Sequence, residues 1–478
     1  MRPARLLFPD LRADANGEYG HQEERIRDCL RLGVGGFILF GGTAVAVAEL
    51  TARLRAGSAH SILIGADLER GAGQQFRGLT QLPPLGALAS LDDLLVLYEA
   101  GRVTAAEARS VGVDWVYAPV ADLAVEPNNP IVGTRSPGAD PRAVARQVSA
   151  WVMGCEAGGA LSCAKHFPGH GRTTTDSHLV LPTVRARERR LAADLTPFAA
   201  AVAAGVPTVM TAHVAYPALD RSGTPATLSR KILTGLLRQR LGFDGLIVSD
   251  AMNMGGVVAA AGAGGAAGIA AVAAGVDALL HPDDPEGLAG ALVAAHPSRL
   301  RPARVADALA RVAGAAARAA LLEPGDSSGA REWAAATARR VVVAVRGSAP
   351  ALRGARVRVR AVDDDLGGPY PPPSRDAFTA ALRREGVEVS EGDTRGARTL
   401  LAVYCELRAW KGRPGLSADS ERAVARAVAD DPDTLVVLFA HPRLAATIPD
   451  GADLVVAWGG EAAMQDAAAA RLADGAPE

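Results

Sequence analysis

Short apolar runs alternate with longer amphipathic segments from Arg5 to His281. Eight runs predict strands: Arg5–Phe8, Gly36–Phe40, Ser61–Ala66, Trp115–Pro119, Leu161–His166, Thr208–His213, Leu246–Ser249 and Asp277–His281. Helical periodicity lies between them at Gln22–Leu32, Ala44–Arg55, Pro141–Ala157, Glu188–Ala204 and Ser229–Leu241. Alternating strands and helices predict a parallel sheet, and eight such units predict a closed TIM-type (β/α)₈ barrel.

A second α/β pattern follows a stretch that contains Pro, Gly and Ser. We expect a catalytic barrel over residues 1–322, a linker over 323–335 and a second domain over 336–478. Its predicted strands are Arg340–Val345, Val357–Val362, Leu400–Cys405, Thr434–Ala440 and Leu454–Trp458, with helices at Arg375–Glu385 and Asp419–Ala429. The fold class is therefore α/β, a barrel followed by a smaller open-sheet α/β sandwich. No G-x-G-x-x-G follows a strand, so we do not expect nucleotide binding.

Ionisable residues fall at or just beyond the carboxyl ends of five predicted barrel strands. They are Asp67, Asp122, the pair Lys165 and His166, His213, and Asp250. Barrel enzymes carry their catalytic groups at this end of the strands. Any one of these residues could be a structural cap, but core packing would favour apolar side chains at all five places. We therefore expect an active site there.

The segment AKHFPGHGRTTTDSH, Ala164–His178, carries three of the chain's nine histidines. The alternative to an active-site segment is a surface loop with scattered histidines. Metal binding is also conceivable, because His166, His170, Asp176 and His178 are close in sequence. The spacing matches no H-E-x-x-H pattern, and Lys165 beside His166 disfavours a nearby cation, so we expect neither a metal nor another cofactor.

Carboxylates, imidazoles and cations around a barrel mouth suit a sugar, whose hydroxyls need directional donors and acceptors. Cleavage of a glycoside with retention needs a nucleophilic carboxylate and a proton donor. Asp250 fits the nucleophile. The donor could be another carboxylic acid, or His178 oriented by Asp176, since imidazole can donate and later accept a proton. On spacing alone, a simple loop hydrogen bond explains Asp176 and His178 equally well.

Composition narrows the classes of partner. The net charge of −1 predicts no nucleic-acid or anionic-membrane surface, and the four cysteines follow no disulfide or metal spacing. The N-terminus lacks an apolar signal region, so we expect a cytoplasmic monomer. The uncharged stretch Gly255–Gly275 consists mostly of alanine and glycine, so we interpret it as a packed helix rather than a membrane span.

Several motifs together resemble glycoside hydrolase family 3, in its β-N-acetylglucosaminidase branch. They are Lys165–Gly171, Asp176–His178 with Leu181-Pro182, Ile131–Ser136, Met210–His213, Pro217–Asp220, Pro225–Ser229 and Ser249–Met252. The resemblance covers most of residues 1–320, and residues beyond them are more loosely similar to the family's α/β sandwich domain. It implies that Asp250 is the nucleophile and that His178 is the acid/base, oriented by Asp176. It also implies a sugar subsite made of Asp67, Arg135, Lys165, His166, His213 and Met252.

Two positions depart from the family's pattern. Leu68-Glu69-Arg70-Gly71 stands where an acidic residue followed by two glycines is usual, and Arg172 stands where an acidic residue is common. These departures affect one edge of the subsite and the charge of the loop.

The resemblance implies a retaining exo-β-N-acetylglucosaminidase that acts on muropeptides or chitin-type oligosaccharides. Relatives that are β-glucosidases generally take their acid from the second domain, and the Asp176/His178 pair argues against that branch. A phosphorylase on the same scaffold stays open, because a neutral imidazole repels phosphate less than a carboxylate does. A protein that binds sugar without cleaving it would be expected to have lost these catalytic residues.

Overall fold

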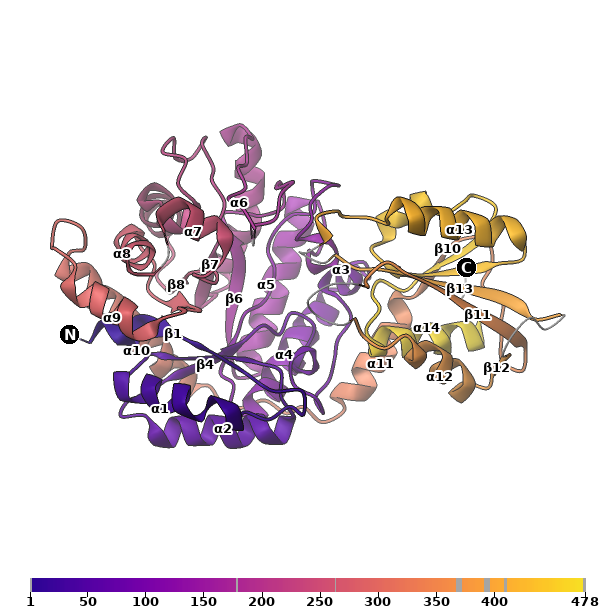
Figure 1. Ribbon diagram of the computed structural model, residues 1–478, viewed down its shortest axis with the longest axis horizontal. Helices are drawn as coiled ribbons and strands as arrows, with labels where there is room; N and C mark the ends of the chain where they lie inside the picture. Colours follow the sequence, from indigo (N-terminus) through magenta and orange to yellow (C-terminus); the bar gives the residue numbers. More distant parts are fainter. Residues whose placement is uncertain are drawn as a thin grey trace. The chain divides into compact units, whose positions relative to one another are not determined.

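The computed structural model describes residues 2–177, 179–262, 264–366, 372–390, 396–407 and 411–475. The chain divides into two compact units (Figure 1). The first comprises Met1–Gln81, Asp93–Val132 and Ser136–Ser328, and the second comprises Leu82–Asp92, Gly133–Arg135 and Gly329–Glu478. Two short segments from the first half of the sequence therefore belong to the second unit.

The first unit is built on parallel strands. They are β1 (Leu7–Phe8), β2 (Asp10–Arg12), β3 (Gly36–Phe40), β4 (Leu63–Ala66), β5 (Trp115–Val116), β6 (Leu161–Phe167), β7 (Thr208–Thr211), β8 (Leu246–Val248) and β9 (Leu279–Leu280). Strands β2 to β8 pair in sequence order, and β1 pairs with β9. The ring closes because only Pro9 separates β1 from β2 and a parallel bridge joins Val248 to Ala278. The predicted TIM-type barrel is confirmed.

Pro9 divides the first predicted strand. Proline has no backbone N–H to donate, so the ladder is interrupted there. Its carbonyl still accepts from the amide of Ile38 at 3.0 Å, so β1 and β2 run in line along β3.

Helices surround the strands of the barrel unit (Figure 1). They are α1 (Glu23–Leu32), α2 (Ala44–Gly57), α4 (Leu94–Ser110), α5 (Pro141–Ala157), α6 (Glu188–Ala203), the π-helix η6 (Lys231–Arg240), α7 (Gly255–Ala261), α8 (Gly265–Ala274), α9 (Pro285–Ala294) and α10 (Pro302–Leu321). The predicted helices begin and end within two residues of these bounds. Helix α5 approaches α4 closely at Gly154, where an added Cβ would lie 1.8 Å from the carbonyl of Tyr98.

The described residues contain no single helix that is long and apolar enough to cross a membrane. Helices α7 and α8 meet the length and composition test only as a pair, and they are bent by 93°.

The second unit contains a six-stranded sheet in the order β10-β15-β14-β13-β11-β12, parallel except for β10. The strands are β10 (Val343–Arg346), β11 (Arg356–Asp363), β12 (Glu388–Val389), β13 (Arg398–Cys405), β14 (Leu435–Ala440) and β15 (Asp453–Val456). Helices α11 (Ala330–Val341), α12 (Asp376–Arg384) and α14 (Ala462–Asp474) pack on one core, and α13 (Ala418–Asp430) packs on another. The open α/β sandwich is confirmed.

Helix α11 corrects two predictions for this part of the chain. It begins inside the predicted linker 323–335 and occupies the start of the predicted strand Arg340–Val345. The buried positions Ala330, Ala334, Ala338 and Val341 recur at helical spacing, so this face packs on the core of the second unit.

Candidate active site

A buried lysine joins two carboxylates at the carboxyl ends of β4 and β6. Lys165 lies in β6 with 2% of its side chain exposed, and its Nζ is 2.6 Å from Asp67 Oδ1 and 2.7 Å from Glu69 Oε1. Asp67 directly follows β4 and keeps 33% of its side chain exposed, so it can also accept hydrogen bonds from a ligand. Asp67 and Lys165 were predicted here, but the role of Glu69, an acidic residue three positions beyond the end of β4, was not.

Asp122 is fully buried and anchors the end of β6. Its Oδ2 lies 2.7 Å from His166 Nδ1, and its Oδ1 accepts the backbone N–H groups of His166 at 3.2 Å and His170 at 2.6 Å. Burial raises the pKa of Asp122, but His166 and these donors outweigh burial and hold the pKa below its usual value. Because the carboxylate accepts at Nδ1, the other ring nitrogen of His166, Nε2, is left for a ligand.

Hydrogen bonds within the loop after β6 order its first half. The ring of His170 places Nδ1 2.8 Å from Thr173 Oγ1 and Nε2 3.0 Å from Ser177 Oγ. Asn129 donates from Nδ2 to the carbonyl of His170 at 2.9 Å. Burial lowers the pKa of His170 to about 4, so this ring is neutral at pH 7.

The same loop packs against the segment that follows Asp250. The carbonyl of Ser177 accepts from the amide of Gly256, at the start of α7, at 3.1 Å. An added Cβ at Gly256 would lie 3.0 Å from that carbonyl and 3.1 Å from the carbonyl of Val180, so a side chain there would crowd this contact. Asp176 is buried one residue before this contact, and His178 lies outside the described residues.

Asp250 follows β8 by two residues, and a buried histidine supports its backbone. The amide of Ala251 donates to Asp250 Oδ1 at 2.8 Å, and the carbonyl of Ala251 lies 2.9 Å from His213 Nε2. Because a carbonyl only accepts, His213 donates from Nε2, and its Nδ1 lies 2.7 Å from Thr227 Oγ1. Burial lowers the pKa of His213 against the pull of the Asp250 charge. His213 therefore has protein partners at both ring nitrogens and is 0% exposed.

Met252 ties this segment to the neighbouring strand. Its amide donates to the carbonyl of Leu280 at 2.9 Å, and the amide of Leu280 donates to Ser249 Oγ at 3.0 Å. These bonds place Leu280, the end of β9, level with the turn that carries Asp250.

His281 is a residue of this mouth that the sequence analysis did not assign. It directly follows Leu280 and is buried, with its ring 5.0 Å from that of Phe40 and its Nδ1 3.8 Å from Asp10 Oδ2. Burial lowers its pKa, although Asp10 opposes the shift. Its signal was available, because it is an ionisable residue at the carboxyl end of the eighth predicted strand.

Arg135 is the described site residue that the barrel unit does not include. It lies in η4 (Gly133–Arg135), which packs on α3 (Leu85–Ala89) in the second unit. Within the described part of the chain, no group of three or more His, Cys, Asp or Glu side chains is arranged to hold a metal ion.

The barrel mouth thus offers a carboxylate at Asp250, a cation between carboxylates at Lys165 and imidazoles whose ring nitrogens are oriented. Residues 13–315 match the family model described as the glycosyl hydrolase family 3 N terminal domain. The chain belongs to this family. It is a glycoside hydrolase with a barrel and an α/β sandwich.

Two sequence relatives match just over half of this glycoside hydrolase, whereas two solved structures match nearly all of it. A beta-hexosaminidase of Chromobacterium violaceum is 41% identical over 295 residues, which are 59% of this chain and 80% of that protein. A beta-hexosaminidase of Neisseria meningitidis serogroup C is 39% identical over 54% of this chain and 73% of its own length. Among solved structures, a family 3 beta-N-acetylglucosaminidase from Paenibacillus sp. matches 99% of this chain and 96% of its own, with a TM-score of 0.84 and 27% identity. A beta-glucoside phosphorylase matches 99% and 91%, with a TM-score of 0.85, but its 24% identity shows the fold alone.

Proposed function

We propose that the chain is a retaining exo-β-N-acetylglucosaminidase. The names of the matched relatives support hydrolysis of β-linked N-acetylhexosamine. The observation that carries the proposal is the bond from Gly256 to Ser177, which brings the loop bearing Asp176 against the segment that follows Asp250. A nucleophile and an acid/base pair must share one mouth, and this contact joins the two segments that would supply them.

In this mechanism, Asp250 attacks the anomeric carbon and forms a covalent glycosyl-enzyme intermediate. His178, oriented by Asp176, protonates the departing oxygen and then takes a proton from the attacking water. His213 donates to the carbonyl of Ala251 and so fixes the turn that aims Asp250.

The glycone would be held by the groups next to Asp250. Asp67 accepts from sugar hydroxyls while Lys165 donates, and His166 presents Nε2 to the sugar. Arg135 and Met252 complete the subsite in the proposal. Muropeptides or chitin-type oligosaccharides are the proposed substrates, and the chain would act as a cytoplasmic monomer without nucleic-acid or membrane partners.

The test compares p-nitrophenyl β-GlcNAc with the matching β-glucoside, each with and without phosphate. We expect faster release from the GlcNAc conjugate, no phosphate dependence, and the β anomer of GlcNAc as the first product in proton NMR spectra. Preference for glucose would place the protein in the β-glucosidase branch, and an α anomer released first would contradict retention.

Phosphorolysis is the alternative that the phosphate arm tests. A phosphorylase must bind phosphate beside the intermediate, and Arg172 is a cation that the loop could contribute. Its Nε lies 2.6 Å from Asp194 Oδ2, and the side chain of Asp194 is only 4% exposed. This pairing neutralises Arg172, which favours water over phosphate as the acceptor. Release of GlcNAc 1-phosphate in phosphate buffer would contradict hydrolysis.

A further inference from the structure

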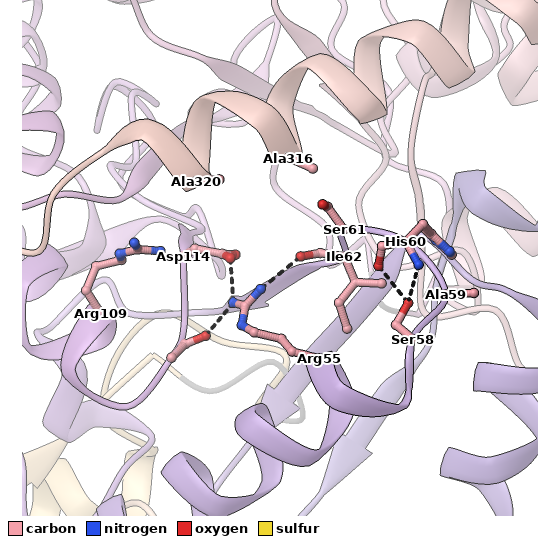
Figure 2. Close-up of a pocket in the computed structure, with 11 residues that line it drawn as sticks. Arg55, Ser58, Ala59, His60, Ser61, Ile62, Arg109, Asp114, Ala316 and Ala320 are labelled. Carbon is pink, nitrogen blue, oxygen red and sulfur yellow. Dashed lines mark hydrogen bonds and ion pairs between the residues drawn. The ribbon is translucent and has the colours of Figure 1, made fainter.

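A long hollow lies at the amino ends of the first barrel strands, on the face opposite the carboxyl ends. One cavity of about 600 Å³ is lined by Arg55, His60, Arg109, Asp114 and residues of α10 (Figure 2). A second cavity of about 530 Å³ is lined by Arg2, Arg5 and α10, and it shares His60, Ser61 and Ala316 with the first. We call these two cavities together the basal groove.

The position of the basal groove follows from the strands. Arg5 precedes β1, Ser61 precedes β4 and Asp114 precedes β5. Catalytic groups of barrels lie at the carboxyl ends of the strands, so the groove is separate from the site around Asp250.

The carboxylate in the basal groove is fully engaged. The guanidinium of Arg55 donates to Asp114 Oδ2 at 2.6 Å, to the carbonyl of Gly112 at 2.8 Å and to the carbonyl of Ile62 at 3.2 Å. Figure 2 shows Arg55 between Asp114 and Ile62. Asp114 Oδ1 accepts from the amide of Ile64 at 2.9 Å. Arg55 and Asp114 therefore cancel each other and brace the strand ends, leaving neither charge for a ligand.

The other arginines of the groove form no ion pair with a carboxylate among the described residues, although Arg109 also acts electrostatically on Asp114. The side chains of Arg2 and Arg5 make no hydrogen bond or ion pair with any residue that the structure describes, although Arg5 Nε is buried. Arg109 donates once, to the carbonyl of Leu322 at 3.2 Å, and its buried Nε has no partner among the described residues. Buried donors without acceptors are uncommon in folded proteins, so these guanidinium groups keep donors that an anion could accept.

The wall opposite these cations is apolar. Helix α10 contributes Leu309, Val312, Ala313 and Ala316 to the groove. A ligand that satisfies both sides carries an oxyanion for the arginines and a small apolar part for the helix. Guanidinium groups match the paired oxygens of carboxylate and phosphate.

We propose that the basal groove binds small organic oxyanions, phosphate or carboxylate metabolites, at Arg5 in one cavity and at Arg109 in the other. The sites are independent of the hydrolytic function proposed above. Because an anion held there binds the folded protein and not the unfolded chain, occupancy stabilises the barrel.

The test titrates the protein with inorganic phosphate and with citrate, against chloride at equal ionic strength, by calorimetry and thermal unfolding. We expect both a measurable Kd and a rise in Tm for at least one of the two anions. The pair of probes separates phosphate from carboxylate chemistry. The double variant Arg5→Met/Arg109→Met should weaken binding in each cavity by about tenfold to a hundredfold, since one lost charge-assisted hydrogen bond is worth about 1.5–3 kcal/mol.

Three controls keep the result decisive. Arg27→Met removes an exposed arginine of α1 that does not line the groove, and it should leave Kd unchanged. Arg5→Lys keeps the charge but not the fork, and should give an intermediate Kd. Lys165→Met removes the buried cation of the barrel mouth, and binding should survive it.

Two results would overturn the proposal. One is the absence of binding by both anions. The other is binding that Lys165→Met abolishes and Arg5→Met/Arg109→Met leaves intact, because the anion would then occupy the barrel mouth.

Discussion

The carboxylates at the amino ends of the barrel strands have different cationic partners from those at the carboxyl ends. At the amino ends, Asp114 pairs with Arg55, and Asp277 pairs with both Arg238 and Arg304. At the carboxyl ends, Asp122 pairs with His166 and Asp67 pairs with Lys165. Arginine stays protonated at every physiological pH, whereas imidazole and a buried ammonium can change their charge.

The ion pairs at the amino ends therefore stabilise the fold, whereas the charged groups at the carboxyl ends serve catalysis. Asp277 also accepts from the amide of Ile247 at 2.9 Å, so its arginine pairs hold the start of β8. The charged groups at the other end of β8 hold a turn and a loop that must meet a substrate. Substitutions at the amino ends should therefore change stability, and substitutions at the carboxyl ends should change turnover.

Asp250→Ala should give the largest effect. Losing the nucleophile should lower kcat on p-nitrophenyl β-GlcNAc on the order of 10⁵-fold. This corresponds to a rise of about 7 kcal/mol in the activation free energy. The free energy of unfolding in urea should change by less than about 1 kcal/mol, because Asp250 does not brace a strand end. Near-normal turnover by the folded variant would remove Asp250 from the mechanism.

Asp277→Ala should show the opposite profile. It leaves the guanidinium groups of Arg238 and Arg304 without their buried carboxylate, which should lower the free energy of unfolding by about 3–5 kcal/mol. The folded fraction should keep its kcat. Asp307→Ala is the matched control, since Asp307 is an exposed partner of the same Arg304 and should cost less than about 1 kcal/mol. Equal losses in the two variants would contradict a bracing role for Asp277.

His170 makes the carboxyl-end loop sensitive to pH. Its pKa is about 4 in the folded protein, against an ordinary value of 6.5, so the unfolded chain binds more protons between these values. The stability that it contributes is complete above pH 6.5 and is lost as pH falls toward 4. The loss should reach about 3 kcal/mol.

The control is His170→Gln, which cannot titrate. Urea unfolding at a series of pH values should show a flatter decline below pH 6.5 for this variant than for the natural protein. Parallel declines would show that the other buried histidines carry the dependence.

Much of the fold was predictable because the barrel strands are short apolar runs that alternate with segments of helical periodicity. The interruption at Pro9 and the start of α11 at Ala330 were not predicted. The alanine pattern of α11 indicates a face only once the second unit supplies something to pack against. Local composition near Pro324 and Gly325 favoured a linker there.

The site was predictable as far as strand ends indicate it. Asp67, Lys165, His213 and Asp250 all lie where that rule placed them. The contact from Glu69 to Lys165 depends on how the chain turns after β4, which spacing alone does not specify. The basal groove has no sequence motif at all, because barrel closure brings together arginines that are far apart in the chain.

His281→Asn tests the smallest expected effect, at a residue between the structural and the catalytic groups. His281 lies at the carboxyl end of β9, beside the turn of Asp250, yet its ring contacts Phe40 and lies near Asp10. Asparagine should lower kcat/KM by about tenfold, or about 1.4 kcal/mol, through kcat rather than KM, because the variant removes the imidazole that interacts electrostatically with Asp250. Unfolding in urea should change by less than that amount. A stability loss with unchanged kcat/KM would instead make His281 a brace, and the division between the two strand ends would no longer hold at β9.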